Sequence, residues 1–315
     1  MNKKVVVLGG GTGMSYLLRG LKNFPVDITA VVSVCDDGKS TGRLREEFRI
    51  PAVGDLRRIL VALSETEPLV EKLLNYRFKT HSDLNGHTVG NLLLTALCHV
   101  SGSMSDGIES LEKVFNLKGK VLPLTEDNVI LMAETNDGVI LEGEHNITES
   151  EKVIKKVFYK EDPVIHEKVI NAISEADLII LSMGSLYTSV IPNLLSNKIL
   201  DAIDNSNAKI VYTCNLVTQP GETDGFSVSD HIKVLNSYLK SRKVDIVMAN
   251  NSKIKESIAL KYSSLEQKDP VILDVLKIKK MNVKVIQDNF VLIEDNLIRH
   301  DSLKLGFHIF SLLLN

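Results

Sequence analysis

The sequence has few cysteines, little net charge and no long apolar run, and each shortage excludes a class of protein. Its three cysteines lie far apart without metal-type spacing, so we interpret Cys35, Cys98 and Cys214 as reduced, small apolar side chains. No apolar run approaches the roughly 18 residues of a membrane helix, and no signal-peptide core follows the opening MNKK. We therefore expect a cytoplasmic protein that does not insert into a membrane.

The charges nearly cancel, because 37 basic residues face 40 acidic ones for a net charge of −3. Such a chain has no global field that would attract nucleic acid, so we expect no nucleic-acid partner, although local phosphate sites are compatible with it. With 315 residues and 44% apolar content, the sequence favours a single large α/β domain over 1–315 rather than two intimate domains. Proteins of this class often form dimers, so we also expect a homo-oligomer.

A glycine turn near the start is the strongest local signal. Residues 5–8 are apolar, a helical apolar stripe begins at Met14, and between them lie Gly9, Gly10, Gly11, Thr12 and Gly13. The order predicts a buried strand, a tight turn and a helix. Glycine has no Cβ, so the backbone N–H groups of such a turn can approach an anion at the helix N-terminus. The turn therefore predicts a site for a nucleotide or another phosphate ester, with a ligand-free tight turn as the alternative.

Two standard phosphate motifs fit less well. Met14 stands where the dinucleotide fingerprint has its third glycine, and Ser33 stands where a Walker A loop has its first.

The second predicted strand, residues 28–34, ends at a polar, glycine-flanked segment. Asp36 lies where a nucleotide fold commonly holds a ribose hydroxyl, and Asp36 with Asp37 could instead hold Mg²⁺. Lys39, Ser40 and Thr41 add phosphate-compatible donors. The alternative is an ordinary exposed Asp-Asp-Gly turn.

Two helix N-termini carry further candidates. Asp55 opens a helix over 51–63 and is either a first-turn carboxylate that complements the helix dipole or a site residue. His87 and Asn91 crowd the start of a helix with an apolar stripe from Val89 to Val100. His87 and Asp55 are the candidate catalytic residues, and Asn91 is a candidate ligand-binding residue.

Residues 120–150 change to a period of two and predict a hairpin-rich β insertion. Its Glu142, Glu144 and His145 are predicted to be solvated strand residues without chemistry.

The second half returns to α/β order, and polar groups follow two predicted strands over 177–183 and 209–212. After the first strand comes Ser185, in a small polar turn that precedes a helix, and after the second come Asn215, Thr218, Gln219, Glu222 and Thr223. Open α/β sheets bind ligands at the carboxyl ends of their strands. The whole pattern predicts a Rossmann-like, doubly wound, mainly parallel sheet flanked by helices.

Six segments together resemble one family, the bacterial gluconeogenesis factors, also called YvcK-like. They are, in order, GGGTG, SVCDDGKSTGRLR, PAVGDLRR, HTVGNLLL, DLIILSMGSLYTSVIPNLL and CNLVTQPGETDGF. A more distant resemblance is to 2-phospho-L-lactate transferase. The family's usual GPGSLYTS reads SMGSLYTS here, at residues 182–189.

The resemblance implies a cytoplasmic factor needed for growth and cell shape on gluconeogenic carbon sources, tied to cell-wall precursor supply and able to bind a UDP-sugar. For that ligand, Tyr262 would stack on uracil and Arg299 would clamp the diphosphate. The first hypothesis is therefore a regulatory protein that senses a UDP-sugar and signals to a protein partner. The second is a transferase of the phospholactate type, with Mg²⁺ on Asp36, Asp37 or Asp55 and His87 as base.

Overall fold

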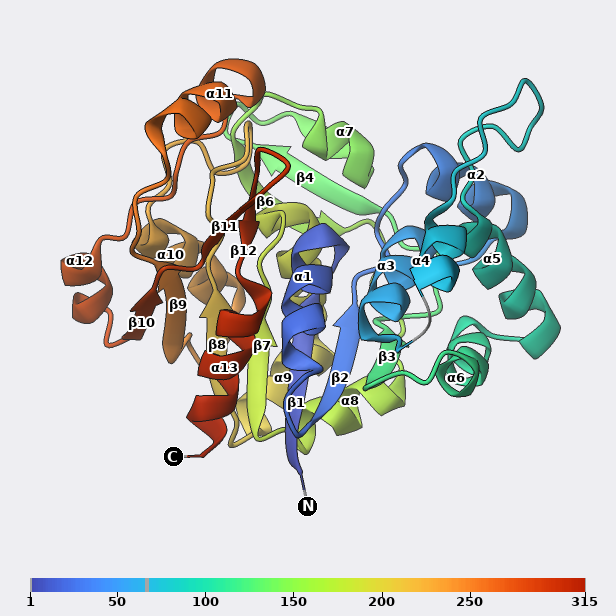
Figure 1. Ribbon diagram of the computed structural model, residues 1–315, viewed down its shortest axis with the longest axis horizontal. Coiled ribbons are helices and arrows are strands. Elements are labelled where there is room, and N and C mark those ends of the chain that lie inside the picture. The colour runs from blue at the N-terminus through green and yellow to red at the C-terminus, as the bar shows by residue number, and fades with distance from the viewer. Residues whose placement is uncertain (1, 66–67, 315) are drawn as a thin grey trace.

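The computed structural model describes residues 2–65 and 68–314. Its main strands are β1 (Lys3–Gly9), β2 (Val26–Val32), β3 (Lys120–Pro123), β7 (Leu178–Leu181), β8 (Lys209–Thr213), β9 (Ile246–Asn250) and β10 (Lys284–Asp288). Within the described residues these seven strands form one parallel sheet in the order β10-β9-β8-β7-β1-β2-β3 (Figure 1). The predicted doubly wound parallel sheet is confirmed.

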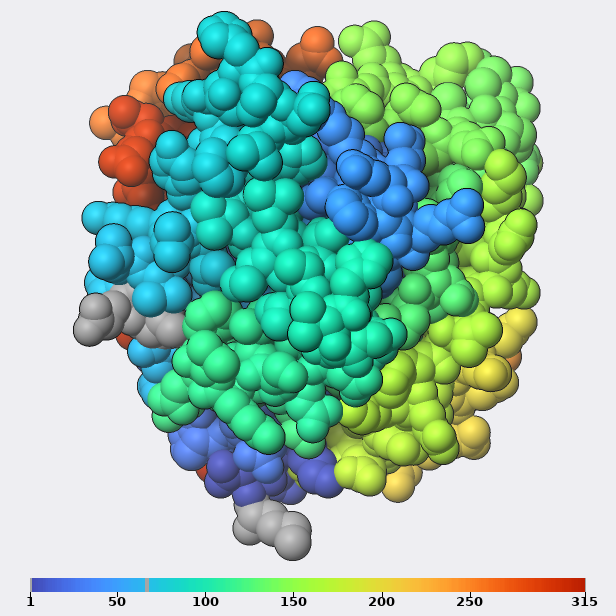
Figure 2. Space-filling view, turned by 90° about the vertical axis from the view of Figure 1, so that its right-hand side faces the viewer, coloured from blue at the N-terminus to red at the C-terminus, as the bar shows by residue number. Residues whose placement is uncertain are grey.

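Helices cover both faces of this sheet, and α1 and α13 lie on the near face in Figure 1 while α8 and α9 lie on the far face. The helices of the described chain are α1 (Gly11–Leu21), α2 (Lys39–Phe48), α3 (Val53–Leu63), α4 (Pro68–Asn75), α5 (Val89–Ser101), α6 (Met104–Val114), α7 (Glu144–Thr148), α8 (Glu167–Ser174), α9 (Asn197–Asn205), α10 (Val228–Tyr238), α11 (Glu256–Glu266), α12 (Val275–Lys280) and α13 (Ser302–Leu313). None of the helices in this described part is both long and apolar enough to cross a membrane. Seen from the side of α5 and α6, the surface belongs mainly to the first half of the chain (Figure 2).

Two small antiparallel sheets complete the described fold. One contains β4 (Leu131–Thr135), β5 (Ile140–Glu142) and β6 (Ile154–Tyr159), and the other pairs β11 (Val291–Glu294) with β12 (Leu297–His300). The bounds 120–150 predicted for the insertion need correction. Residues 120–123 form β3, which pairs with β2 in the main sheet, and the inserted sheet continues through β6 to Tyr159. Pairing with a strand some ninety residues away leaves no trace in local alternation, which is why the sequence pattern placed this boundary wrongly.

The core follows the predicted apolar pattern. Val5, Val7 and Leu8 of β1 are fully buried, as expected for a parallel strand covered on both faces. The stripe Met14, Leu17, Leu18 and Leu21 of α1 is also fully buried.

The segment after β7 differs from the predicted regular helix. It forms a π-helix, η1 (Leu186–Val190), then a 3-10 turn, η2 (Ile191–Leu194), before α9 begins. Pro192 lacks the N–H that a continuous α-helix would use, and the Asn193 amide donates to the carbonyl oxygen of Ser189. Short π-helical turns often occur at functional sites.

The order of strands places the functional end of the molecule. β1 lies between β2 and β7. From β1 the sheet grows through β2 and β3 toward one edge, and through β7, β8, β9 and β10 toward the other, so the strand order reverses between β1 and β7. Ligands of open α/β sheets bind outside the carboxyl ends of the strands at such a switch point. In Figure 1 this end is the upper one, where α1 begins and where α7 and α11 also lie.

Candidate functional site

The glycine turn after β1 combines one special backbone conformation with close packing. Gly11 has a φ of +65°, which favours glycine. A Cβ on Gly13 would lie 2.2 Å from the Met183 carbonyl oxygen, and one on Gly9 would lie 1.9 Å from the Ser182 hydroxyl. The glycine content therefore has a packing cause, the close approach of the loop after β7, which the sequence pattern did not reveal.

The N-terminus of α1 lies at this turn and is open to a ligand. Its N-cap, Gly10, has no side chain that could cap the helix, and the first turn of α1 itself holds no acidic residue. The Gly11 N–H donates to Asp55, which stands in the first turn of α3. The remaining N–H groups carry the partial positive charge of the helix dipole, which favours an anion such as phosphate.

On one side of the turn lies a cavity of about 220 Å³, here called the acidic cavity. Its lining residues are Gly11, Ser33, Asp36, Asp55, Arg58, Glu144, Thr188 and Ser189. Asp36 accepts hydrogen bonds of 3.0 Å from the Thr41 hydroxyl and from the Gly38 N–H. Asp55 pairs with Arg58 at 3.1 Å. Asp36 and Asp55, both predicted from sequence, therefore meet in one cavity.

Burial and mutual repulsion weaken the acidity of two carboxyl groups in this cavity. Burial, and then the charge of Asp36, raise the pKa of Asp55 to about 6. Burial raises the pKa of Glu144 to about 7, with a smaller contribution from Asp36. Both carboxyl groups can therefore gain or lose a proton near neutral pH. Each can then act as an acid, a base or a hydrogen-bond donor toward a ligand.

The predicted Mg²⁺ pair separates in space. The Asp37 carboxylate accepts a 2.7 Å hydrogen bond from the His145 N–H, at the start of α7, while Asp36 faces Thr41 and the acidic cavity. Across residues 2–65 and 68–314, no group of three or more His, Cys, Asp or Glu side chains is arranged to hold a metal. The geometry thus groups Asp36 with Asp55 rather than with Asp37, and Mg²⁺ binding stays a prediction.

On the other side of the turn lies a hollow of about 370 Å³, here called the open cleft. Its lining residues are Thr12, Gly13, Tyr16, Met183, Gly184, Ser185, Asn215, Leu216, Val217, Thr218, Gln219, Tyr262, Glu266, Lys268, Leu297, Ile298, Arg299 and His300. The Arg299 guanidinium lies over the Tyr16 ring, 5.4 Å from its centroid. Tyr262 packs against Leu216 and Ile298, and its hydroxyl accepts the Ile298 N–H at 2.9 Å. The cleft thus joins aromatic surface and a cation to the N-terminus of α1.

Two predicted residues fasten the loops behind the cleft. The Asn215 amide accepts the Gly184 N–H at 3.0 Å and donates to the Gly184 carbonyl at 2.7 Å. The Glu222 carboxylate accepts the Ser185 hydroxyl and the Tyr187 N–H. Glu222 is buried, and burial raises its pKa to about 7.

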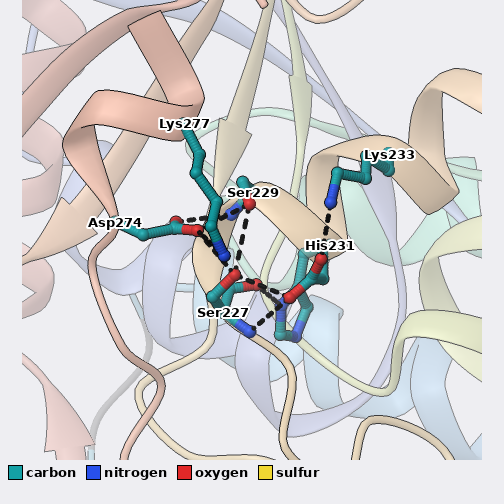
Figure 3. Close-up of polar contacts among 7 residues, drawn as sticks. Ser227, Ser229, His231, Lys233, Asp274 and Lys277 are labelled. Carbon is teal, nitrogen blue, oxygen red and sulfur yellow. Dashed lines mark hydrogen bonds and ion pairs between the residues drawn. The ribbon is translucent and has the colours of Figure 1, made fainter. Parts of the chain in front are cut away.

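The other polar residues of this loop are also engaged by the protein. The Thr223 hydroxyl accepts the Gln219 N–H at 2.9 Å, and Thr218 exchanges hydrogen bonds with Asp269. The loop ends at a cluster around the start of α10 (Figure 3), where Asp274 accepts hydrogen bonds from the hydroxyls of Ser227 and Ser229. This cluster fixes the segment that follows α11 to the segment that follows β8.

A third group of predicted residues is absent from the described residues that line the two hollows. The Ser40 hydroxyl lies 3.0 Å from His87 Nδ1 and accepts the Asn91 amide at 3.2 Å. Burial, and then the charge of Arg43, lower the pKa of His87. Lys39, in the same loop, is exposed. His87 therefore has a serine partner within the fold, and its role as a base stays a prediction.

Several residues that line the hollows were not predicted as site residues from the sequence pattern, among them Ser33, Arg58, Tyr16 and Glu144. Glu142 and His145 are exposed, as predicted for solvated residues, but the same prediction for Glu144 is wrong. Glu144 begins α7 and lines the acidic cavity, because the bond from the His145 N–H to Asp37 holds α7 against the loop after β2. In the sequence, only the two acidic residues Glu142 and Glu144 could have indicated a site in this segment, and such residues are common on solvated strands.

Comparison with known proteins identifies relatives over nearly the whole chain. The profile of the CofD family, described as 2-phospho-L-lactate transferase CofD, matches residues 5–291. The gluconeogenesis factor of Halalkalibacterium halodurans is 47% identical over 306 residues, 96% of this chain and 94% of that protein. The gluconeogenesis factor of Bacillus subtilis is 45% identical, with 98% of each chain covered. A crystal structure of a UPF0052-family protein from Bacillus halodurans superposes with a TM-score of 0.94 at 46% identity, covering 98% of this chain and 99% of that one.

Proposed function

The chain belongs to the CofD family, with close relatives named gluconeogenesis factors, and on that premise we propose that it binds a UDP-sugar as a regulatory protein. Its ligand would report the supply of cell-wall precursors, and occupancy would be passed to a protein partner in the cytoplasm, with consequences for cell shape. We propose that the protein acts as a homo-oligomer.

The meeting of the two hollows at the N-terminus of α1 carries this proposal. Gly11 lines the acidic cavity, and Thr12 and Gly13 line the open cleft. A diphosphate over residues 11–13 would use the N–H groups that Asp55 does not engage and the helix dipole, with Arg299 as a cationic contact. The aromatic surface of Tyr16 and Tyr262 would then support the uracil ring.

A transferase of the phospholactate type is the second candidate function, because the family profile carries that description. Asp36 and Asp55 share the acidic cavity and could hold Mg²⁺ there, which would bridge to the phosphate and polarise it. His87 would need to leave Ser40 to act as a base on a ligand in either hollow.

Calorimetric titration with UDP-N-acetylglucosamine, with and without Mg²⁺, tests the two functions when the incubated ligand is then analysed by chromatography. Saturable binding with an intact ligand supports the sensor. Consumption of the ligand, or binding that requires an added phospho-acid acceptor system, supports the transferase. Absence of binding under all of these conditions would contradict both.

A further inference from the structure

We propose that the acidic cavity is the glycosyl subsite of the bound nucleotide sugar, and that Glu144 of α7 binds the sugar hydroxyls there. This inference rests on the proposed function, because it assigns the part of the UDP-sugar that lies beyond the diphosphate.

The chemistry of the two hollows separates the two ends of such a ligand. The open cleft offers the half-buried ring of Tyr16 beside the buried Tyr262, an aromatic lining that suits a planar base. The acidic cavity offers carboxylate and hydroxyl oxygens and the Arg58 guanidinium, which suit a compact group rich in hydroxyls. A diphosphate at the N-terminus of α1 lies between them, so the sugar enters the acidic cavity when the base occupies the cleft.

Ser33 supplies an independent sign of a ligand. Its side chain lines the acidic cavity and is 2% exposed, and among the described residues its hydroxyl meets only the Cys35 thiol, a weak hydrogen-bonding group. A buried hydroxyl without a strong partner is unfavourable, and native proteins rarely keep one. A sugar hydroxyl in the cavity would provide the missing bond.

Glu144 is held in place before any ligand arrives. Its carboxylate accepts the Thr148 hydroxyl at 2.9 Å and is also bonded by Thr188 of η1. The bond from the His145 N–H to Asp37 fixes the first turn of α7 against the loop after β2. A carboxyl group anchored from two sides, with a pKa raised to about 7 by burial, can both accept from and donate to a sugar hydroxyl at neutral pH.

The test compares UDP-N-acetylglucosamine with UDP, which lacks the sugar, by calorimetry on the full chain. Glu144→Gln and Ser33→Ala are each expected to weaken binding of the UDP-sugar about tenfold and to leave UDP binding unchanged. Glu149→Gln, on the exposed C-cap of α7, is the matched control and should bind both ligands as wild type does. Thermal unfolding should leave Ser33→Ala about as stable as wild type, because within the described fold its hydroxyl gives up only the weak contact with the Cys35 thiol.

Three outcomes would overturn the inference. Equal losses for UDP and UDP-sugar would give Glu144 and Ser33 a structural role, and no loss for either ligand would place the sugar elsewhere. Binding of Mg²⁺ alone that Glu144→Gln abolishes, with UDP-sugar affinity unchanged, would make the cavity a cation site. Failure of the proposed function looks different, since wild type would then bind neither nucleotide, and the subsite would fall with it.

Discussion

The carboxylate of Asp37 accepts a hydrogen bond of 2.7 Å from the backbone N–H of His145, which lies 108 positions later in the chain. The bond joins the loop after β2 to the first turn of α7, and α7 supplies Glu144 to the wall of the acidic cavity. A residue that the sequence pattern placed on a ligand therefore has a partner within the protein.

Replacing Asp37 should loosen this wall. Asp37→Ala removes an acceptor at a helix N-terminus, a loss that typically costs 0.5–2 kcal/mol, so we expect a decrease of about 1 kcal/mol in the free energy of unfolding. Urea denaturation of wild type and Asp37→Ala measures this decrease. Lys39→Ala, an exposed change in the same loop, is the control and should stay within about 0.5 kcal/mol of wild type. Equal stability of both variants would show that the bond to His145 does not hold α7.

Arg299 should matter for binding more than for stability. Its guanidinium rests on the Tyr16 ring and faces the N-terminus of α1, so Arg299→Ala removes a cation from the proposed diphosphate site. We expect the Kd for UDP-N-acetylglucosamine to rise at least about tenfold, the loss expected for a charge-assisted hydrogen bond. Calorimetry provides the Kd, and Arg19→Ala, at the opposite end of the same helix, is the control. An unchanged Kd would remove Arg299 from the site.

Gly13 should be required for folding as well as for any ligand. A Cβ there would lie 2.2 Å from the Met183 carbonyl oxygen, so Gly13→Ala must displace backbone and should cost about 1–3 kcal/mol. Gly107→Ala, where the nearest atom would be 3.3 Å away, is the comparison and should change stability by less than about 1 kcal/mol. Thermal and urea unfolding of the two variants decide whether the glycine turn is under a packing constraint. Similar stability of both would contradict it.

Glu222 should make stability depend on pH. Burial raises its folded pKa from 4.5 to about 7, so the folded protein binds this proton more tightly than the unfolded chain does. The proton on Glu222 therefore stabilises the folded protein most below pH 4.5, and this stabilisation is lost as the pH rises through 7. Glu222→Gln carries no such proton, so the stability of the variant relative to wild type should increase by on the order of 2 kcal/mol between pH 5 and pH 8.

Urea denaturation of wild type and Glu222→Gln across that pH range measures this difference. Taking the difference between the two proteins cancels the contributions of Asp55 and Glu144, whose folded pKa values are also raised. A difference that does not change with pH would show that the pKa of Glu222 is not raised in the folded protein.

The sequence by itself determined the elements and their order. Apolar runs such as Val5–Leu8, and stripes such as Met14, Leu17, Leu18 and Leu21, predict strands and helices because burial acts on neighbouring residues with a fixed period. The glycine turn, Asp36 and Asp55 were also predicted, because polar groups that follow parallel strands collect at one edge of a sheet. Six motifs in order identified the family, and the comparisons confirm it.

Only the tertiary structure decided which side chains face which hollow. Glu144 and Ser33 meet in the acidic cavity, and Tyr16 meets Arg299 in the open cleft, across separations of more than a hundred residues that no local period records. Asp36 and Asp37 are neighbours in sequence, yet one faces the acidic cavity and the other caps α7. The direction of a side chain in a loop is set by the elements packed around it, and those contacts exist only once the chain has folded.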